Sequence, residues 1–290
     1  MLYEKFGKWY SRNYKKLIIL PILAFLLTSL IFVNNYRTTG ELFQKDIDLS
    51  GGIVATLYLS ELPVDLRATF EAQEVTVREI HSVANGNLVA VILEAGPTTE
   101  AEEIEALLNQ TAPGIEYDLR SVGPSMGESF MTSAKKAVII SFILMGIILA
   151  AIFRQPIVAL TVIVSGFLNV YEAAALMTLF GIKLSPHTIG ALLMLMGWGV
   201  DSEVLFDSKI FKGSGGKAIE NALEAMKTAM TMSAAVFAIL IALYVVSSAR
   251  MIKEIALVLL LGALFDIINT WFQSLSMVLW FVERQEAKRA

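Results

Sequence analysis

Residues 197–209 read GWGVDSEVLFDSK, and this stretch places three carboxylates directly after seven almost wholly apolar residues. The acids are Asp201, Glu203 and Asp207. A charge near the centre of a bilayer costs about 2.5–3.5 kcal/mol on insertion scales, so acids within a membrane span mark function unless they lie near an interface. The reading of this stretch therefore depends on whether the surrounding chain is a membrane protein.

The composition indicates a membrane protein. Of the 290 residues, 56% are hydrophobic and only 17% are charged, which is too apolar for a soluble domain. The net charge is −4 and the basic residues cluster at segment ends, so a nucleic-acid partner is not expected. The chain has no cysteine, and its two histidines, His81 and His187, lack metal-ligand spacing, so we expect neither a metal nor a cofactor.

Apolar segments long enough to cross a membrane recur along the chain. A membrane helix needs about twenty mostly apolar residues. Six segments qualify: 17–33, 137–153, 157–180, 188–206, 229–247 and 255–281. The first lacks a cleavage site for a signal peptidase, so we interpret it as a retained anchor. The sequence thus predicts one membrane span followed, after residues 34–136, by a five-helix membrane bundle over 137–282.

Lysine and arginine in short flanking segments predict the orientation, because they favour the cytoplasmic side. The basic segment 1–16, the loop around Lys209 and Lys212, and the tail 283–290 hold most of them. The short loops on the other side keep only Lys183, Arg250 and Lys253. We expect a multi-pass protein of the cell membrane with both termini in the cytoplasm.

Residues 34–136 have a mixed composition that predicts a folded extracytoplasmic domain. Strands are expected at 53–59, 74–80, 88–94 and 115–122, with a helix opening at Pro63, a turn at Asn85-Gly86, and a second helix over 98–109 that a Thr99/Glu102 capping box would begin. This βαββαβ order is typical of a ferredoxin-like α+β domain.

Three of the predicted spans carry polar residues at helical spacing, which places each set on one helix face. The sets are Ser165, Asn169 and Glu172 in 157–180; Gly190, Met194, Gly197 and Asp201 in 188–206; and Gly262, Asp266, Asn269 and Gln273 in 255–281. The small residues beside Asp201 favour close helix approach, so we expect this aspartate to face protein. The simplest arrangement points the three polar lines at one another around a hydrated path.

Proton relay is the chemistry that a buried Asp201 suits, because a carboxylate can take up a proton on one side and release it on the other. Lys227 is the one deep-lying base that would tune it, although a lysine there is equally explained by snorkelling to the interface. Glu203, on another face, and Asp266 fit a structural role as well as a functional one. Asn169, Asn269 and Gln273 are more simply hydrogen-bonding contacts between helices, and Asp207, beside Lys209, reads as an interfacial, solvated acid.

No enzyme motif emerges. The run FKGSGGKA at 211–218 is not a phosphate loop, because Phe211 replaces the first glycine and Ala218 replaces the required Ser or Thr. We therefore expect a protein that is not an enzyme.

Four motifs in order resemble the SecF family of protein-export membrane proteins, accessory subunits of the Sec translocase that are related to the proton-driven RND transporters. They are DIDLSGG (46–52), VGPSMG (122–127), GWGVDSEVLF (197–206) and AMKTAMTMS (225–233). The resemblance covers nearly the whole chain. It implies a polytopic α-helical membrane protein with six transmembrane helices, an RND-like half, and the extracytoplasmic ferredoxin-like domain.

The resemblance also implies partners and sites. It implies a heterodimer with SecD that assists the SecY translocon, acts on exported preproteins within membrane lipid, and uses an ion gradient. Asp201 falls on the family's functional intramembrane aspartate and Lys227 on its basic position, where the bacterial pattern has arginine. Glu203 is an acid that the bacterial pattern lacks, and the DSE run looks more like the archaeal branch. Glu172, Asp266 and Asn269 would be supporting polar residues.

Two alternatives remain at this stage. One is an RND-like half-transporter for a small molecule or lipid, which a wide apolar pocket in the outer domain would favour. The other is a structural translocon subunit that moves no ions, which would tolerate Asp201→Asn.

Overall fold

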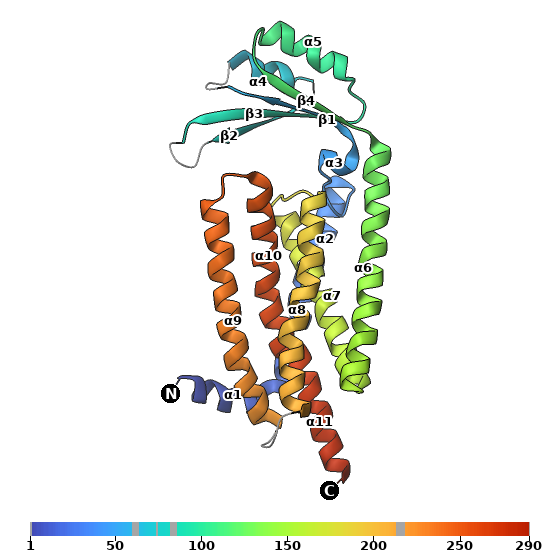
Figure 1. The fold of residues 1–290 in the computed structure, drawn as a ribbon, viewed down its shortest axis with the longest axis vertical. Helices are drawn as coiled ribbons and strands as arrows, with labels where there is room; N and C mark the ends of the chain where they lie inside the picture. Colours follow the sequence, from blue (N-terminus) through green and yellow to red (C-terminus); the bar gives the residue numbers. More distant parts are fainter. Residues whose placement is uncertain (1, 60–63, 74, 82–85, 213–217, 290) are drawn as a thin grey trace. The chain divides into compact units, whose positions relative to one another are not determined.

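The computed structural model describes residues 2–59, 64–73, 75–81, 86–212 and 218–289 (Figure 1). Pro63 and Asn85, which the sequence analysis placed at a helix start and a turn, lie outside these residues. The chain divides into two units. The helical unit comprises Met1–Phe43, Ala137–Ile182 and His187–Ala290, and the sheet unit comprises Gln44–Lys136 and Lys183–Pro186.

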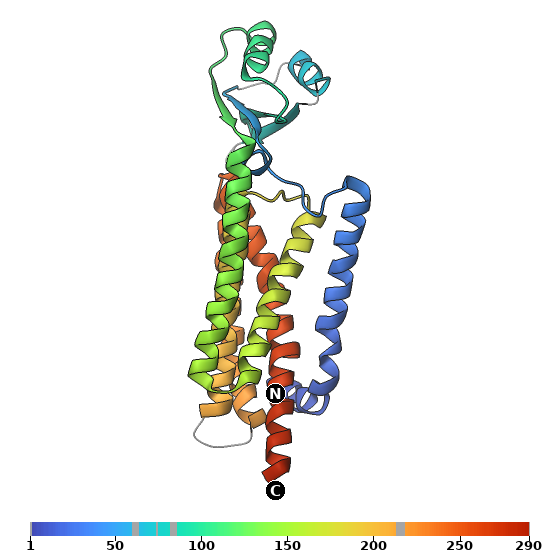
Figure 2. The same ribbon diagram turned by 90° about the vertical axis from the view of Figure 1, so that its right-hand side faces the viewer.

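Long helices make up the helical unit (Figures 1 and 2). They are α1 (Leu2–Leu17), α2 (Ile19–Thr39), α6 (Pro124–Phe153), α7 (Pro156–Leu179), α8 (Pro186–Lys212), α9 (Ala218–Val246), α10 (Arg250–Ile268) and α11 (Leu275–Arg289), with a π-helix, η1 (Asn269–Ser274), between the last two. Pro156 begins α7 at a position where the missing N–H of proline costs nothing. Residues 124–136 of α6 are counted with the sheet unit.

The described residues contain five helices that are long and apolar enough to cross a membrane: Ile19–Thr39, Ser125–Phe153, Pro156–Leu179, Pro186–Phe211 and Ala218–Val246. Large apolar side chains cover the outside of these helices, for example Leu27 on α2 and Ile147 on α6, which are 63% and 61% exposed. Such a surface requires an apolar surrounding. Residues 255–281, where a sixth span was expected, lie in α10, η1 and α11, and none of these helices is among the five.

Within the N-terminal segment, expected only to be basic, Leu2–Leu17 form the amphipathic helix α1. Tyr10 and Tyr14 are buried in a cluster with apolar residues of α8, α9 and α11, including Phe206. The Tyr10 hydroxyl donates a hydrogen bond of 2.6 Å to the carbonyl of Trp271 in the π-helix. On the opposite face Lys8, Arg12, Lys15 and Lys16 are exposed.

A four-stranded antiparallel sheet forms the centre of the sheet unit. Its elements follow as α3 (Ile47–Ser50), β1 (Gly52–Leu57), α4 (Val64–Glu71), β2 (Thr76–His81), β3 (Leu88–Ala95), α5 (Ala101–Thr111) and β4 (Tyr117–Val122), and the strand order is β2-β3-β1-β4. From β1 to β4 this is the expected βαββαβ order. Helices α4 and α5 cover one face, where Phe70 and Ile104 pack against Leu57 and Leu93 (Figure 1).

The start of α5 differs from the sequence prediction, and the structure explains two residues of the DIDLSGG motif. The N-cap of α5 is Glu100 and makes no side-chain hydrogen bond, so the Thr99/Glu102 capping box is wrong by one residue. In DIDLSGG, the Asp46 side chain accepts a hydrogen bond from the backbone N–H of Ile47 and caps α3. Gly52 begins β1 at a φ of 138°, and a Cβ there would lie 2.3 Å from the Ala95 carbonyl oxygen, so only glycine fits.

The segment Lys183–Pro186, between α7 and α8, is bound into the sheet unit. The backbone N–H of Leu184 donates to the Gln44 carbonyl at 2.7 Å, and the Leu184 carbonyl accepts from the N–H of Asp46 at 2.8 Å. Lys183 also forms an ion pair of 2.9 Å with the buried carboxylate of Glu94, which Arg78 approaches at 3.3 Å. Backbone and charge contacts together thus fasten this loop.

Candidate functional site

Three elements of the helical unit bring buried polar side chains together. On α7, Ser165, Asn169 and Glu172 are fully buried. Asp266 at the end of α10 and Asn269 at the start of η1 are buried as well, at 6% and 0% exposure. The spacing that predicted a shared face on each helix is therefore confirmed, and both faces point into the bundle.

A chain of hydrogen bonds joins these residues. The amide of Asn169 donates to Oδ1 of Asp266 at 2.8 Å. The Asn269 amide donates to Oδ1 of Asn169 at 2.8 Å and to Oε2 of Glu172 at 2.7 Å. Thr270 adds a hydroxyl donor to Oδ1 of Asp266 at 3.3 Å. Two carboxylates and two amides thus form one network, which we call the polar cluster.

Helix α8 closes the polar cluster with its backbone and adds a third carboxylate beside it. Gly199 lies so close that a Cβ there would be 2.9 Å from both Asn169 Nδ2 and Asp266 Oδ1. One turn later Glu203, which is 2% exposed, accepts a hydrogen bond of 3.1 Å from the Ser274 hydroxyl. Asp207 follows on the same face and is 2% exposed. Carboxylates therefore line the buried side of α8 as well.

Among the described residues, these acids have no cation partner. Within the part of the chain that the structure describes, no lysine or arginine forms an ion pair with Glu172, Glu203, Asp207 or Asp266. Oε1 of Glu172 and Oδ2 of Asp207 also make no hydrogen bond to described residues. A buried carboxylate without a cation partner is costly unless it binds a proton, even when it accepts hydrogen bonds. Carboxyl groups in this setting are therefore chemically suited to binding a proton.

The π-helix η1 supplies much of the polar lining. Its six residues read NTWFQS, and four of them, Asn269, Thr270, Gln273 and Ser274, are buried. Single π turns inside α-helices occur frequently at functional sites. The sequence pattern identified Asn269 and Gln273 but missed Thr270 and Ser274, because an α-helical spacing does not put all four on one face.

Asp201 differs from its expected position. The whole line Gly190, Met194, Gly197 and Asp201 shares a face as predicted, but that face is exposed on the chain. The expectation that Asp201 faces protein is therefore wrong for the single chain. Two residues correspond to about 200° around a helix, so Asp201 lies opposite Gly199 and Glu203. Lys227, its expected partner on α9, is also exposed.

Asp207 is the second correction. The neighbouring Lys209 predicts an interfacial, solvated acid, but Asp207 is buried. It stands four residues after Glu203 and so falls on the same inward face. Asp207, rather than Asp201, thus continues the acidic line into the bundle.

Apolar helices around buried, unpaired carboxylates define a polytopic helical membrane protein, and the comparisons with known proteins agree. Residues 103–284 match the family model of the C-terminal region of protein-export membrane proteins SecD/SecF. The SecF proteins of Pyrococcus furiosus and Methanothermobacter thermautotrophicus are each 32% identical, covering 98% and 94% of this chain and 97% and 94% of theirs. The chain belongs to the SecF family, which confirms the resemblance in its motifs.

Solved structures support the fold. The crystal structure of SecDF, a translocon-associated membrane protein from Thermus thermophilus, superposes with a TM-score of 0.72 at 19% identity over 94% of this chain. SecDF in its super-membrane-facing form gives a TM-score of 0.65 at 17% identity over 93% of this chain. The chain spans 38% of the length of each of these proteins.

Proposed function

We propose that the chain is an accessory subunit of the Sec translocase that, with SecD, couples a proton gradient to late steps of preprotein export through SecY. Membership of the SecF family supports the export role. The observation that carries the ion coupling is the set of buried carboxylates on α7, α8 and α10 that have no cation partner among the described residues. The protein is not an enzyme in this proposal.

The exposed position of Asp201 gives SecD a role in the same proposal. An exposed carboxylate within an apolar helix is costly against lipid. Lys227 is exposed on α9, and the relatives of known structure contain more than twice the length of this chain. We infer that SecD, as a second half of similar topology, covers this face, and that Asp201 exchanges protons at the junction while the polar cluster supports it.

The topology completes the proposal. We take 255–281 as the sixth span, both termini as cytoplasmic in the cell membrane, and the sheet unit as an extracytoplasmic ferredoxin-like domain, which its strand order supports. The chain has no cysteine, so single cysteines at Lys8 and Asp118 would report the side directly. A membrane-impermeant thiol reagent should label the second and spare the first in intact cells; the reverse pattern would contradict the orientation.

The test of function is export of a secretory substrate into inverted vesicles that contain the chain and its partner, with and without a proton gradient. Asp201→Asn should lose the gradient-dependent increment and keep the rest. Asp118→Asn, an identical change at an exposed position of β4, is the matched control and should behave as wild type. If Asp201→Asn also responds as wild type, the aspartate is structural and the relay is wrong.

Glu203→Gln distinguishes the buried side of α8 from its exposed face in the same assay. The amide keeps the acceptor for Ser274 but cannot bind a proton at physiological pH. Loss of the gradient-dependent increment would assign proton transfer to the buried side of α8 as well. If Glu203→Gln exports normally while Asp201→Asn is defective, proton exchange is confined to the exposed face of α8.

A further inference from the structure

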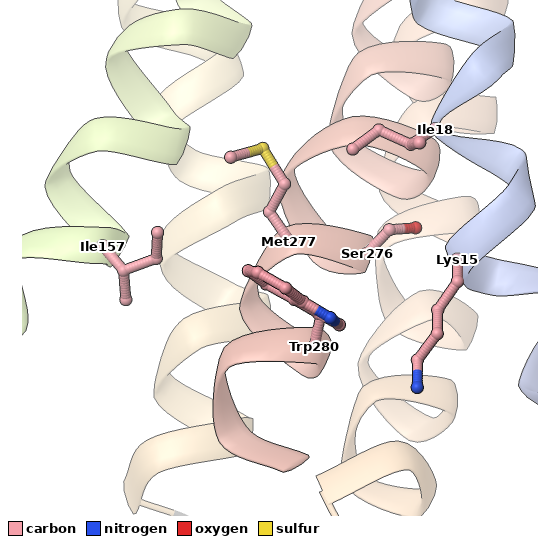
Figure 3. A pocket seen from close by; sticks show the side chains of 6 residues that line it. All are labelled: Lys15, Ile18, Ile157, Ser276, Met277 and Trp280. Atoms are coloured by element: carbon pink, nitrogen blue, oxygen red, sulfur yellow. The ribbon is translucent and has the colours of Figure 1, made fainter. Parts of the chain in front are cut away.

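A cavity of about 300 Å³ opens at the junction of α1, α2, α7 and α11, within the helical unit (Figure 3). Its volume is at the lower end of the range for small-molecule sites. It is lined by Lys15, Ile18, Ile157, Ser276, Met277 and Trp280. None of these residues belongs to the polar cluster or to the exposed line on α8, so the function proposed above leaves the cavity unused.

The lining has one polar and one apolar side. Ile157 and Met277 form the apolar side, whereas the ammonium of Lys15 and the hydroxyl of Ser276 lie on the side of α1, with Ile18 above them (Figure 3). Trp280 lies between them. Tryptophan and lysine are the residues that anchor a protein at the level of the lipid headgroups. The cavity therefore has the polarity of an amphiphile.

Ser276 is the observation that points to a ligand. Its side chain is 3% exposed and lines the cavity, and its Oγ lies near the Tyr10 hydroxyl without forming an aligned hydrogen bond to it or to any other described residue. A buried hydroxyl without a partner costs about 1–3 kcal/mol. An oxygen acceptor entering the cavity would satisfy this donor.

The charge around the opening favours an anion. Lys8, Arg12, Lys15 and Lys16 are exposed on the same face of α1, and Arg284 stacks on the Trp280 ring with its guanidinium carbon 3.9 Å from the ring centre. Lys15 is paired with Glu283 at 2.7 Å. Both side chains of this pair are about half exposed, and an ammonium has three donors, so Lys15 can hold a second oxygen beside that carboxylate.

We propose that this cavity binds an anionic membrane lipid, with an acyl chain between Ile157 and Met277 and the phosphate held by Lys15 and Ser276. Basic sites between helices at the membrane surface recognise anionic headgroups. The amphipathic helix α1 presents the basic face at which such a headgroup would lie. The proposal is independent of any role in export.

The test is native mass spectrometry of the full-length chain in detergent with added phosphatidylglycerol or phosphatidylcholine. The wild type should retain phosphatidylglycerol preferentially, and Lys15→Ala should weaken retention about fivefold. Lys16→Ala is the matched control, since Lys16 is an exposed neighbour that does not line the cavity. Equal losses in both variants would mean diffuse attraction to α1 and would overturn the site.

Two further variants act in opposite directions. Ser276→Leu fills the cavity and removes the hydroxyl, and should abolish the preference. Glu283→Gln releases Lys15 from its ion pair and should strengthen retention of phosphatidylglycerol, an outcome that a misfolded protein cannot produce. Unchanged retention in Glu283→Gln would overturn the assignment of Lys15.

Quenching of tryptophan fluorescence by brominated phosphatidylglycerol locates the lipid without disturbing the site. The quenched fraction should fall in Trp280→Phe, because the ring lines the cavity. Displacement by millimolar inorganic phosphate would identify a free phosphate site, and displacement by SecD would identify a protein interface. Either result would overturn the lipid proposal.

Discussion

Asn269 holds the polar cluster together, because its single amide group donates to both Asn169 and Glu172. Asn269→Leu would leave a buried carboxylate and a buried amide oxygen without donors, so we expect a loss of about 1–3 kcal/mol in the free energy of unfolding. Thermal unfolding in detergent measures it. The matched control is Thr161→Val, which removes a fully buried hydroxyl that bonds only within α7, to the Val158 carbonyl. Equal effects of the two changes would mean that the cluster carries no special stability.

Glu254 at the start of α10 makes the stability of the helical unit depend on pH. Burial alone would raise the pKa of this carboxyl, but hydrogen bonds from His187 at 2.7 Å and Arg250 at 2.6 Å hold the pKa below its ordinary value of 4.5. A carboxyl with a lowered folded-state pKa stabilises the protein fully above its unfolded value and loses that contribution as the pH falls through the folded value.

We therefore expect the thermal midpoint to fall as the pH is lowered below about 4.5, and expect Glu254→Gln to flatten this part of the profile. Thermal unfolding in detergent at a series of pH values from 6 to 3 measures the effect. Glu100→Gln, at an exposed position of the sheet unit, is the control and should keep the wild-type profile. A profile that Glu254→Gln leaves unchanged would contradict the assignment.

At the scale of single residues, the sequence predicts which side chains share a helix face but not which way the face points. The spacing grouped Asn169 with Glu172 and Asp266 with Asn269, and their hydrogen bonds connect the two groups. It also grouped Gly197 with Asp201. The side of α8 that faces the bundle is instead the side of Gly199, where the absence of a side chain leaves room for Asn169 and Asp266. Only tertiary packing reveals that choice.

The elements follow the sequence closely where hydrophobic periodicity is strong. The strands of the sheet unit and helix α7 begin and end near their expected positions, whereas α6 and α9 begin at Pro124 and Ala218, well before the expected 137 and 229. The π-helix Asn269–Ser274 was not expected, because a residue added to one helical turn leaves no mark in composition. The basic residues of α1 indicate only orientation, but the spacing of Phe6, Tyr10, Tyr14 and Leu17 also fits one face of an amphipathic helix.

Two glycines of α8 provide a matched pair for testing the packing of that helix. Gly199→Ala would force a methyl group against Asn169 and Asp266, and overpacking of this kind costs about 1–3 kcal/mol. Gly197→Ala meets nothing within 4 Å and should be neutral or stabilising by up to about 1 kcal/mol through helix propensity. Thermal unfolding of the isolated chain measures both. If Gly197→Ala destabilised the chain more than Gly199→Ala, the conclusion that Gly199 faces the polar cluster would be wrong.

At the scale of the whole molecule, the chain exposes a face that would be unfavourable in contact with lipid, because it carries a charged residue and small residues. Gly190, Gly197 and Asp201 lie on it along α8, and Lys227 is exposed on α9. Small residues in such a line allow close approach of another helix. This face is where we expect the chain to meet its partner.

Gly197→Leu tests that expectation, because it adds a large side chain to the face at a position where no atom lies within 4 Å of the added Cβ. We expect unchanged unfolding of the isolated chain and a co-purified yield of SecD that is reduced about tenfold, as a clash of about 1.4 kcal/mol would give. Ala151→Leu, at an exposed position of α6, is the control for added bulk. Full recovery of SecD with Gly197→Leu would exclude this part of α8 from the interface.

The loop between α7 and α8 increases the number of covalent links between the two units. A domain inserted into a chain has two covalent links to its host and can swing about the line that joins them. Here the backbone passes between the units at four places, because Lys183–Pro186 belongs to the sheet unit and is fastened there by Leu184 and by the Lys183–Glu94 ion pair. The loop acts as an additional tether, so a displacement of the sheet unit is transmitted by peptide bonds to the last turn of α7 and the first turn of α8, the helices that carry Glu172 and Glu203.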